Sequence, residues 1–399
     1  MQVEDGADRS VRAGELGLCL SGGGYRATLF HLGAVRRLHE LGLLGRLDTI
    51  SSVSGGSIFA GVLADLAIRE GWQQGLQVGD FDRQVAEPVR RLTKRDMRTL
   101  PFLAHALYNW LLPGPRARHL VALCSRHVSS RPLRELPDRP RFVFCATDIT
   151  FGVNWESSKQ RTGSFQAGYL KDGGGWPIGR AVAASACFPP IFGPLRVGAP
   201  ASAYAGGEQR RDDEGLRLRG MVALSDGGVY DNMALQPVQD SHATVLVSDC
   251  GAPFAFRSGG NVLRRLMRYT SVVQNQAHDL RVRMFFTGIS KKWHLGATWG
   301  IASELGDAVP AYSDALVGER ISRIRTDLDP FTDAEQCILE NHGYCVAEQR
   351  LREKAPHLVA RDAPAAAPPH SEWMHEARVR RALRDSHKRF ALRRMWGRA

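Results

Sequence analysis

The chain has 399 residues, of which 43% are hydrophobic, and it carries a formal net charge of +12. This length and apolar content allow a large buried core, so we expect one α/β domain with additions rather than three separate modules. The seven cysteines are odd in number and lack the paired C-x-x-C spacing of a zinc site, which predicts mostly reduced thiols in the core.

The first predicted strand ends in a glycine-rich turn. Leu18-Cys19-Leu20 is an apolar run that leads into Ser21-Gly22-Gly23-Gly24, and the spacing of apolar residues over 28–41 predicts a helix after it. Backbone N–H groups at a helix N-terminus can hold the oxyanion of an acyl transfer, so Gly22, Gly23 and Gly24 are the candidate oxyanion hole. A phosphate-binding loop is the weaker alternative, because no Lys-Ser or Lys-Thr follows and Ala27 replaces the last glycine of G-x-G-x-x-G.

A second strand-to-helix turn follows, between a predicted strand over 49–53 and a predicted buried helix over 57–68. Its centre, Ser52-Val53-Ser54-Gly55-Gly56, is a relaxed form of the G-x-S-x-G elbow, with Ser52 at the first glycine and Gly56 at the last. A serine raised on such an elbow can attack a carbonyl, so Ser54 is the candidate nucleophile. The alternative is a Ser/Gly-rich loop without catalytic work.

A helical insertion is expected over about 69–140. Within it, residues 100–113 are markedly apolar and aromatic, which suits a cap over an acyl-chain channel or a surface that dips into a bilayer; ordinary core packing explains the same pattern equally well. Two apolar runs that end in aspartate, 142–148 and 243–249, are typical of buried parallel strands and extend the sheet.

A candidate base lies at the end of another predicted strand, in Ser225-Asp226-Gly227-Gly228. Active-site residues of α/β sheets gather at this edge, whereas an ordinary Asp-Gly turn would give the same pattern. A carboxylate accepts a proton from serine only if burial raises its pKa. Gly227 and Gly228 would support the loop. The thirteen histidines offer none in a suitable strand-end context for a triad.

The C-terminal third is basic. Residues 261–284 are expected to form a basic helix, 363–369 a Pro/Ala linker, and 371–399 a basic tail with interleaved aromatic residues. Such a tail favours an anionic membrane surface; a partner groove, nucleic acid, or docking on the protein's own acidic face are the alternatives. We divide the chain into a tail (1–13), a catalytic core (14–255), a helical part of the same domain (256–362), and the linker with its tail (363–399).

Taken together, these motifs resemble the patatin-like phospholipases and lipid acyl hydrolases, which are related to the cytosolic phospholipase A2 group. The match runs in order through 22–26, 52–56 and 226–228, with a fourth block at 183–190. The resemblance implies a three-layer α/β fold with a mostly parallel central sheet, helices on both faces, a helical cap insertion and a helical C-terminal extension. It also implies a Ser54–Asp226 dyad without metal or cofactor.

By the same resemblance, Arg26 would hold a substrate phosphate, with an ion pair at the helix start as the alternative. The chain departs from the family at Ala27, at Ser52, and at Asn232-Met233-Ala234, where Asn-x-Pro is usual.

The implied function is hydrolysis of membrane glycerolipids, of the phospholipase A or lysophospholipase type, with a phospholipid or other glycerolipid as substrate. The alternative is a regulated membrane-targeting effector whose lipase site stays silent until an activator or partner binds. Residues 1–8 lack the apolar stretch of a signal peptide, and the apolar segment 58–68 is short for a membrane span. We therefore expect a cytoplasmic protein, with the inner membrane face as the place where the basic tail would bind. Nucleic acid is the weaker partner, and oligomerisation stays open.

Overall fold

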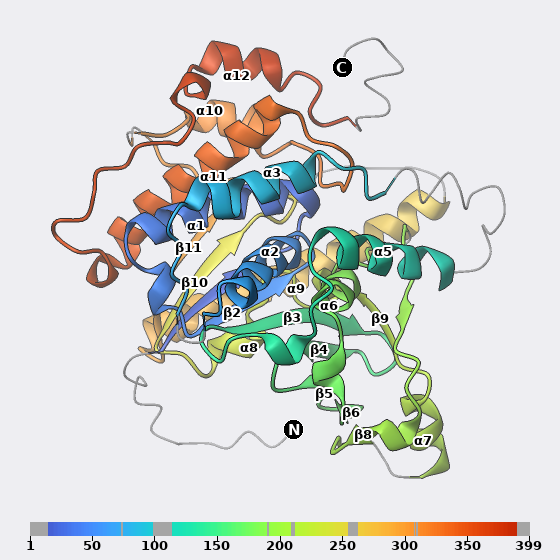
Figure 1. The fold of residues 1–399 in the computed structure, drawn as a ribbon. Coiled ribbons are helices and arrows are strands. Elements are labelled where there is room, and N and C mark those ends of the chain that lie inside the picture. The colour runs from blue at the N-terminus through green and yellow to red at the C-terminus, as the bar shows by residue number, and fades with distance from the viewer. Residues whose placement is uncertain are drawn as a thin grey trace.

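A computed structural model describes residues 15–72, 75–98, 114–189, 191–208, 212–253, 262–306, 308 and 310–388 (Figure 1). The apolar segment 100–113, with its predicted cap or membrane role, lies outside the described residues, as do the N-terminal tail and residues 389–399.

An eleven-stranded sheet forms the centre of the described part of the chain. Its parallel half has the order β11-β10-β1-β2-β3 and is built from apolar strands: β1 (Leu16–Leu20), β2 (Thr49–Val53), β3 (Arg141–Asp148), β10 (Thr244–Asp249) and β11 (Leu295–Gly300). An antiparallel half continues from β3 through β4 (Val153–Ser157), β5 (Thr162–Ser164), β6 (Gly168–Leu170) and β8 (Tyr204–Ala205). Two further strands, β7 (Leu195–Arg196) and β9 (Ala223–Asp226), pair with each other beside β3.

Helices cover both faces of the parallel half, as the alternation of side chains along β1 requires. Leu18 and Leu20 join the large core under α1 (Gly24–Glu40), α2 (Gly55–Arg69) and α11 (Asp333–Lys354). Cys19 joins a smaller core under α8 (Gln236–Gln239) and α9 (Val262–Ser290), which runs behind the sheet in Figure 1. The predicted three-layer α/β fold with a mostly parallel core is therefore confirmed.

The remaining α-helices are α3 (Glu87–Thr93), α5 (Gly114–His127), α6 (Ile178–Ser185), α7 (Asp213–Arg219), α10 (Asp314–Leu316) and α12 (Glu376–Ala382). Short 3-10 or π turns are η1 (Leu44–Arg46), η2 (Asp82–Ala86), η3 (Leu133–Glu135), η4 (Gly173–Gly175), η5 (Ala201–Ala203), η6 (Gly227–Val229), η7 (Val317–Ile321), η8 (Pro356–Leu358) and η9 (Ser371–Trp373). Within the described ranges, we find no helix that has both the length and the apolar character needed to cross a bilayer.

The register along β3 determines where the two catalytic motifs meet. Strand β2 pairs with the first part of β3, and its last residue, Val53, lies opposite Cys145. Strand β9 pairs with the rest of β3, and its last residue, Asp226, lies opposite Ala146. Because β4 occupies the other edge of β3 from Phe144 to Asp148, which includes the end of the β2 pairing and all of the β9 pairing, β2 and β9 must share one edge and meet end to end. Neighbouring positions of β3 thus bring Ser54 and Asp226 together.

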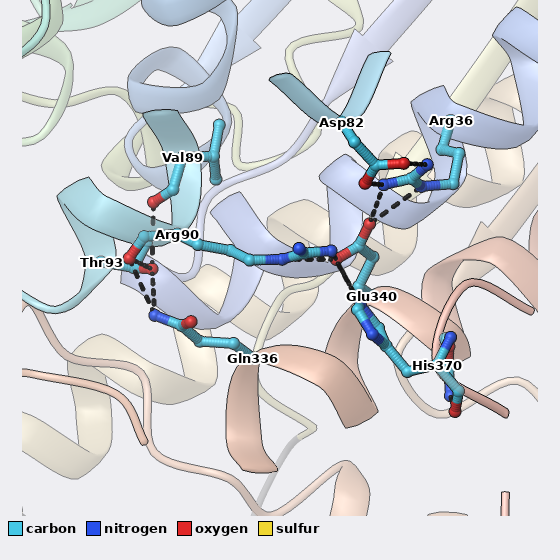
Figure 2. A network of polar contacts seen from close by, with 9 residues as sticks. Arg36, Asp82, Val89, Arg90, Thr93, Gln336, Glu340 and His370 are labelled. Carbon is cyan, nitrogen blue, oxygen red and sulfur yellow. Dashed lines mark hydrogen bonds and ion pairs between the residues drawn. The ribbon is translucent and has the colours of Figure 1, made fainter. Parts of the chain in front are cut away.

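A buried ionic network joins α1 and α11 to two other segments (Figure 2). Glu340 of α11 accepts hydrogen bonds from Arg36 of α1, at 2.9 and 2.8 Å, and from Arg90 of α3. It also lies 3.0 Å from Nε2 of His370, and Arg36 in turn binds Asp82 of η2. The network therefore ties the insertion after α2 and the C-terminal segment to the same core.

Residues 363–388 are part of the folded domain. The Ala367 N–H donates to the Tyr344 hydroxyl at 3.0 Å, and Val379 and Leu383 are buried in the main core. The Ser386 carbonyl accepts a hydrogen bond from the Arg325 N–H at 3.1 Å. The described part of the predicted linker and basic tail thus follows the alternative of a segment docked on the protein itself, because its apolar side chains find partners there.

Candidate active site

Ser54 lies on a strained elbow between β2 and α2. Its backbone has φ 51° and ψ −115°, a left-handed conformation that is unfavourable for a residue with a Cβ atom. The strain is held by neighbours: the Ser54 N–H donates to the Ser185 hydroxyl at 2.9 Å, and the Ser185 hydroxyl donates to the Cys145 carbonyl at 2.6 Å. This geometry is that of a nucleophile elbow, in which the serine side chain stands clear of strand and helix.

Glycine is required directly after Ser54. A Cβ atom on Gly56 would lie 2.3 Å from the Leu20 carbonyl oxygen, and one on Gly55 would lie 2.1 Å from the carbonyl oxygen of Gly24. The start of α2 can therefore approach β1 and the glycine-rich turn only without side chains at these two positions. This is the physical reason for the predicted supporting role of Gly56.

Asp226 is a buried carboxyl at the end of β9. Its Oδ1 accepts a hydrogen bond from the Gly228 N–H at 2.8 Å, whereas Oδ2 is buried without a hydrogen bond of normal geometry to the described residues. The pKa of Asp226 is raised from 3.8 to about 6 because the effect of burial outweighs the interactions with the Ser54 hydroxyl and the Gly228 N–H, which lower it. The Ser54 hydroxyl is thus close enough to interact with this carboxyl. A carboxylate with such a pKa is a far better base than an exposed one.

The loop after Asp226 is fixed by contacts that the sequence did not reveal. The Thr147 hydroxyl donates to the Asp226 carbonyl at 2.8 Å, and the Gly227 carbonyl accepts hydrogen bonds from the N–H groups of Tyr230 and Asp231. Thr147 belongs to β3, far away in the chain, so no local signal pointed to it. Ala234 has φ 55°, so the turn that proline would normally shape is here a strained one.

The glycine-rich turn offers two free backbone donors rather than three. The Gly22 N–H donates to the Asn232 carbonyl at 3.0 Å and is therefore already used. The N–H groups of Gly23 and Gly24, at the start of α1, donate to no described residue. Of the three predicted oxyanion-hole donors, the N–H of Gly22 is thus occupied, and those of Gly23 and Gly24 stay candidates. Asn232, whose carbonyl fixes the turn, was not predicted to contact it.

Arg26 does not face the site. Its side chain is buried, and its two terminal nitrogens donate to three carbonyls, those of Ser322 and Ile324 at 2.9 Å and that of Cys250 at 2.8 Å. These contacts contradict the predicted role of Arg26 in holding a substrate phosphate, and they also differ from the alternative of an ion pair. Arg26 instead fastens the segment before α11 to the start of α1, through partners too distant in sequence to be foreseen.

Ser54, Asp226 and the three glycines line a cavity of about 1300 Å³. Helix α9 forms one wall and contributes His278 and Arg281. His278 Nε2 lies 2.8 Å from Asp249, and this contact raises the pKa of His278 above its usual value. Arg281 lies 3.3 Å from Asp231 and over the ring of Tyr230. Both side chains are thus paired with carboxylates, Asp249 and Asp231, that line the same cavity.

One group of possible metal ligands occurs in the described ranges, and it lies outside this cavity. Ligand atoms of Cys337, His370 and Glu372 all lie within 4.8 Å of one another. The guanidinium of Arg90 is 2.8 Å from Nε2 of His370, which puts a positive charge beside the group. The other cysteines, six of the seven, are buried thiols.

The model of the patatin-like phospholipase family matches residues 18–238, which include the glycine-rich turn, Ser54 and Asp226. The chain belongs to this family. Membership among the patatin-like phospholipases supports a lipid-hydrolase function. No curated protein matches the chain significantly.

Two solved structures are similar to this family member. VipD from Legionella pneumophila has 14% identity and a TM-score of 0.35, over 86% of this chain and 67% of VipD. Human GIVD cytosolic phospholipase A2 has 11% identity and a TM-score of 0.36, over 60% of this chain and 46% of the human protein. The chain thus spans about two thirds of VipD and less than half of the human phospholipase.

Proposed function

We propose that the protein is a serine acyl hydrolase of membrane glycerolipids, of the phospholipase A or lysophospholipase type, that works through a Ser54–Asp226 dyad. One observation carries the proposal: the register along β3 sets Ser54 on a strained elbow beside a buried carboxyl whose pKa is raised to about 6. A serine needs a base of this kind to become a nucleophile at neutral pH.

In the proposed reaction, Asp226 takes the proton of the Ser54 hydroxyl while Oγ attacks the ester carbonyl. The N–H groups of Gly23 and Gly24 stabilise the resulting oxyanion. The tetrahedral intermediate collapses, the C–O bond to the alcohol breaks, and Asp226 returns the proton to the departing alcohol. Water then attacks the acyl-enzyme with Asp226 again as base, which releases the fatty acid and restores Ser54.

The lining of the cavity supports a glycerolipid substrate. Phe188, Ile191 and Phe192 offer an apolar surface for an acyl chain, and Arg281, which is paired with Asp231, brings a cation to the same cavity. Ser54 lines this cavity too, so a lipid bound there would present its ester to the proposed nucleophile.

Labelling with a fluorophosphonate probe tests the nucleophile. We expect the resting protein to be labelled at Ser54, and labelling to vanish in Ser54→Ala but not in the matched Ser51→Ala, whose serine is buried on β2. Mass spectrometry of the products from mixed-lipid vesicles would then separate phospholipase A1, phospholipase A2, lysophospholipase and triacylglycerol lipase activity. An unlabelled Ser54 in a protein that still hydrolyses the vesicles would overturn the proposed mechanism.

A second candidate is an effector whose lipase site is completed only by an activator. The observation that favours it is Oδ2 of Asp226, which lacks a hydrogen bond of normal geometry to Ser54 or any other described residue. Labelling of Ser54 that appears only after a cell extract or a purified partner is added would support this candidate.

A further inference from the structure

Helix α9 is amphipathic in the opposite sense to an ordinary surface helix. A surface helix normally turns its apolar stripe to the core and its polar face to water. In α9, the side that lines the active-site cavity is polar over most of its length: Ser271, Gln274, Asn275, His278 and Arg281. Only near its C-terminal end does this side carry core residues, of which Phe285 is buried.

The outward side of α9 is apolar. Tyr269, Val273, Leu280 and Met284 recur at spacings of four, seven and four residues, which places them on one stripe of a helix with 3.6 residues per turn. They are 65%, 67%, 56% and 57% exposed. No described element covers them, so this surface, which we call the α9 stripe, is an apolar face without a partner within the described chain.

Two arginines lie beside the α9 stripe. Arg265 and Arg283 lie on the same side of the helix, are exposed, and form no ion pair with a described residue. Gln276 and Thr287 are further polar residues close to the stripe. One carboxylate, Asp279, lies one turn before Arg283; it accepts a hydrogen bond from the Asn275 side chain and lies 3.6 Å from Nδ1 of His278. An exposed apolar stripe edged by unpaired arginines complements the acyl region and the phosphates of an anionic bilayer.

The α9 stripe is also continuous with the mouth of the active-site cavity. Tyr269 belongs to the stripe and, together with Arg265, lines the cavity. The stripe and the polar cavity wall lie on opposite sides of one helix, so they are about 10 Å apart. If the protein sits on a bilayer through the stripe, a lipid would have to move only a short distance around the N-terminal half of α9 to enter the cavity.

We propose that the α9 stripe is the surface by which the protein docks on anionic phospholipid membranes, with Tyr269, Val273, Leu280 and Met284 in the headgroup region and Arg265 and Arg283 on the phosphates. The proposal rests on the lipid-hydrolase function proposed above. It transfers the membrane contact from the basic tail, whose described part is docked on the domain, to a helix beside the catalytic cavity.

The test measures binding apart from catalysis. Full-length Ser54→Ala protein is sedimented with vesicles of phosphatidylcholine and phosphatidylserine, with and without the triple change Val273→Asp, Leu280→Asp and Met284→Asp. We expect the triple change to weaken vesicle binding by about tenfold or more, because three apolar side chains that would insert into the bilayer are replaced by charged ones. The matched control, Met221→Asp, alters a residue that is also 57% exposed but lies outside α9 and the cavity, and it should bind normally.

Three further measurements keep the outcome clear. In a protein that keeps Ser54, the triple change should leave hydrolysis of a soluble short-chain ester intact. If the triple variant does not fold, the milder double variant Val273→Ser and Leu280→Ser is tested in its place. Arg283→Glu should weaken binding to anionic but not to neutral vesicles. Undiminished vesicle binding by these variants would overturn the proposal, as would a wild-type dimer in solution that the triple change converts to a monomer, since the stripe would then be a protein interface.

Discussion

Two buried carboxyls of this protein have opposite acidities. Asp226, at the end of β9, has a pKa raised to about 6 because burial outweighs two hydrogen bonds that lower it. Glu340, in the middle of α11, has a pKa of about 2: burial alone would raise it, but the His370 contact and the charges of Arg36 and Arg90 outweigh burial. The two groups are almost equally hidden from solvent, at 3% and 0% exposure.

The difference lies in the partners. Glu340 faces the guanidinium groups of Arg36 and Arg90 (Figure 2), which favour its charged form. Among the described residues, Asp226 interacts with a serine hydroxyl and one backbone N–H, and no cation lowers its pKa. A buried carboxylate without a cation costs free energy, and that cost is what makes it a base. The charge of Asp226 is therefore expected to cost stability at the proposed active site, whereas the charge of Glu340 is expected to contribute stability between α1 and α11.

The largest effect should follow from breaking the catalytic pair. Ser54→Ala and Asp226→Asn should each lower the rate of hydrolysis of a soluble ester by at least about a thousandfold, and the double variant should be little worse, because the two residues act as a unit. Rates are compared at equal amounts of folded protein. Comparable activity in either single variant would contradict the dyad.

Removal of the C-terminal segment should produce the next largest effect. Deleting residues 370–399 takes away His370 from Glu340 and the buried side chains of Val379 and Leu383. We expect a loss of about 4 kcal/mol in the free energy of unfolding. The control is full-length Val379→Ala, for which roughly 2 kcal/mol is expected. Equal denaturation midpoints for the truncated and full-length chains would show that docking of this segment contributes no stability.

Neutralising Glu340 should destabilise without affecting chemistry. In Glu340→Gln, Arg90 loses its carboxylate partner and Arg36 keeps only Asp82, so the free energy of unfolding should fall by about 3 kcal/mol. The exposed Glu353→Gln, on the same helix, is the matched control. Because the pKa of Glu340 is lowered on folding, its contribution is present above pH 4.5 and is lost as pH falls toward 2. A Glu340→Gln protein as stable as wild type at pH 7 would refute the comparison.

Neutralising Asp226 should change the free energy of unfolding in the opposite direction, toward higher stability. Its pKa is raised on folding, so the folded state binds more protons between pH 3.8 and about 6, and stability is lost as pH rises through this window. Asp226→Asn should therefore be more stable than wild type at pH 8, by about 3 kcal/mol, although inactive. In the wild type, activity on a soluble ester should fall as pH drops through about 6. A destabilised Asp226→Asn protein would mean that the charge of Asp226 is compensated by a contact not identified above.

The smallest expected effect is that of metal removal. The dyad needs no Lewis acid, so treatment with a chelator should leave hydrolysis of a soluble ester unchanged. Restoration by zinc or calcium after a loss of activity would contradict this. Cys337→Ser distinguishes metal binding by the group around His370 from chemistry in the cavity. It should change any zinc binding but not the rate of ester hydrolysis.

Much of the catalytic framework could be predicted from the sequence because it is local. Strands β1, β2, β3 and β10 are apolar runs, and two of them end abruptly in small residues, which marked the elbow and the glycine-rich turn. Strands β5, β6 and β8 have two or three residues each, too few to show an alternating pattern, and they were not predicted.

The errors concern side chains whose partners are distant in the chain. The two terminal nitrogens of Arg26 donate to carbonyls of residues 250, 322 and 324, so its motif position indicated a role that its fold does not allow. The close crossing of α1 and α11 likewise depends on Gly33 and Gly343, whose Cβ atoms would lie within 2 Å of the opposite backbone. Nothing in the sequence near either glycine indicates that the two helices cross closely at these positions.

The meeting of β2 and β9 on one edge of β3 has a consequence for biosynthesis. Ser54 leaves the ribosome early, but the strand that carries its base is synthesised much later and must still find its place beside Ala146. A nascent chain that ends before β9 therefore carries an elbow without a base. A one-residue slip of β9 would turn Asp226 to the other face of the sheet. If the proposed dyad is the active site, a chain that ends before β9, or in which β9 has slipped, lacks the proposed base and should be inactive.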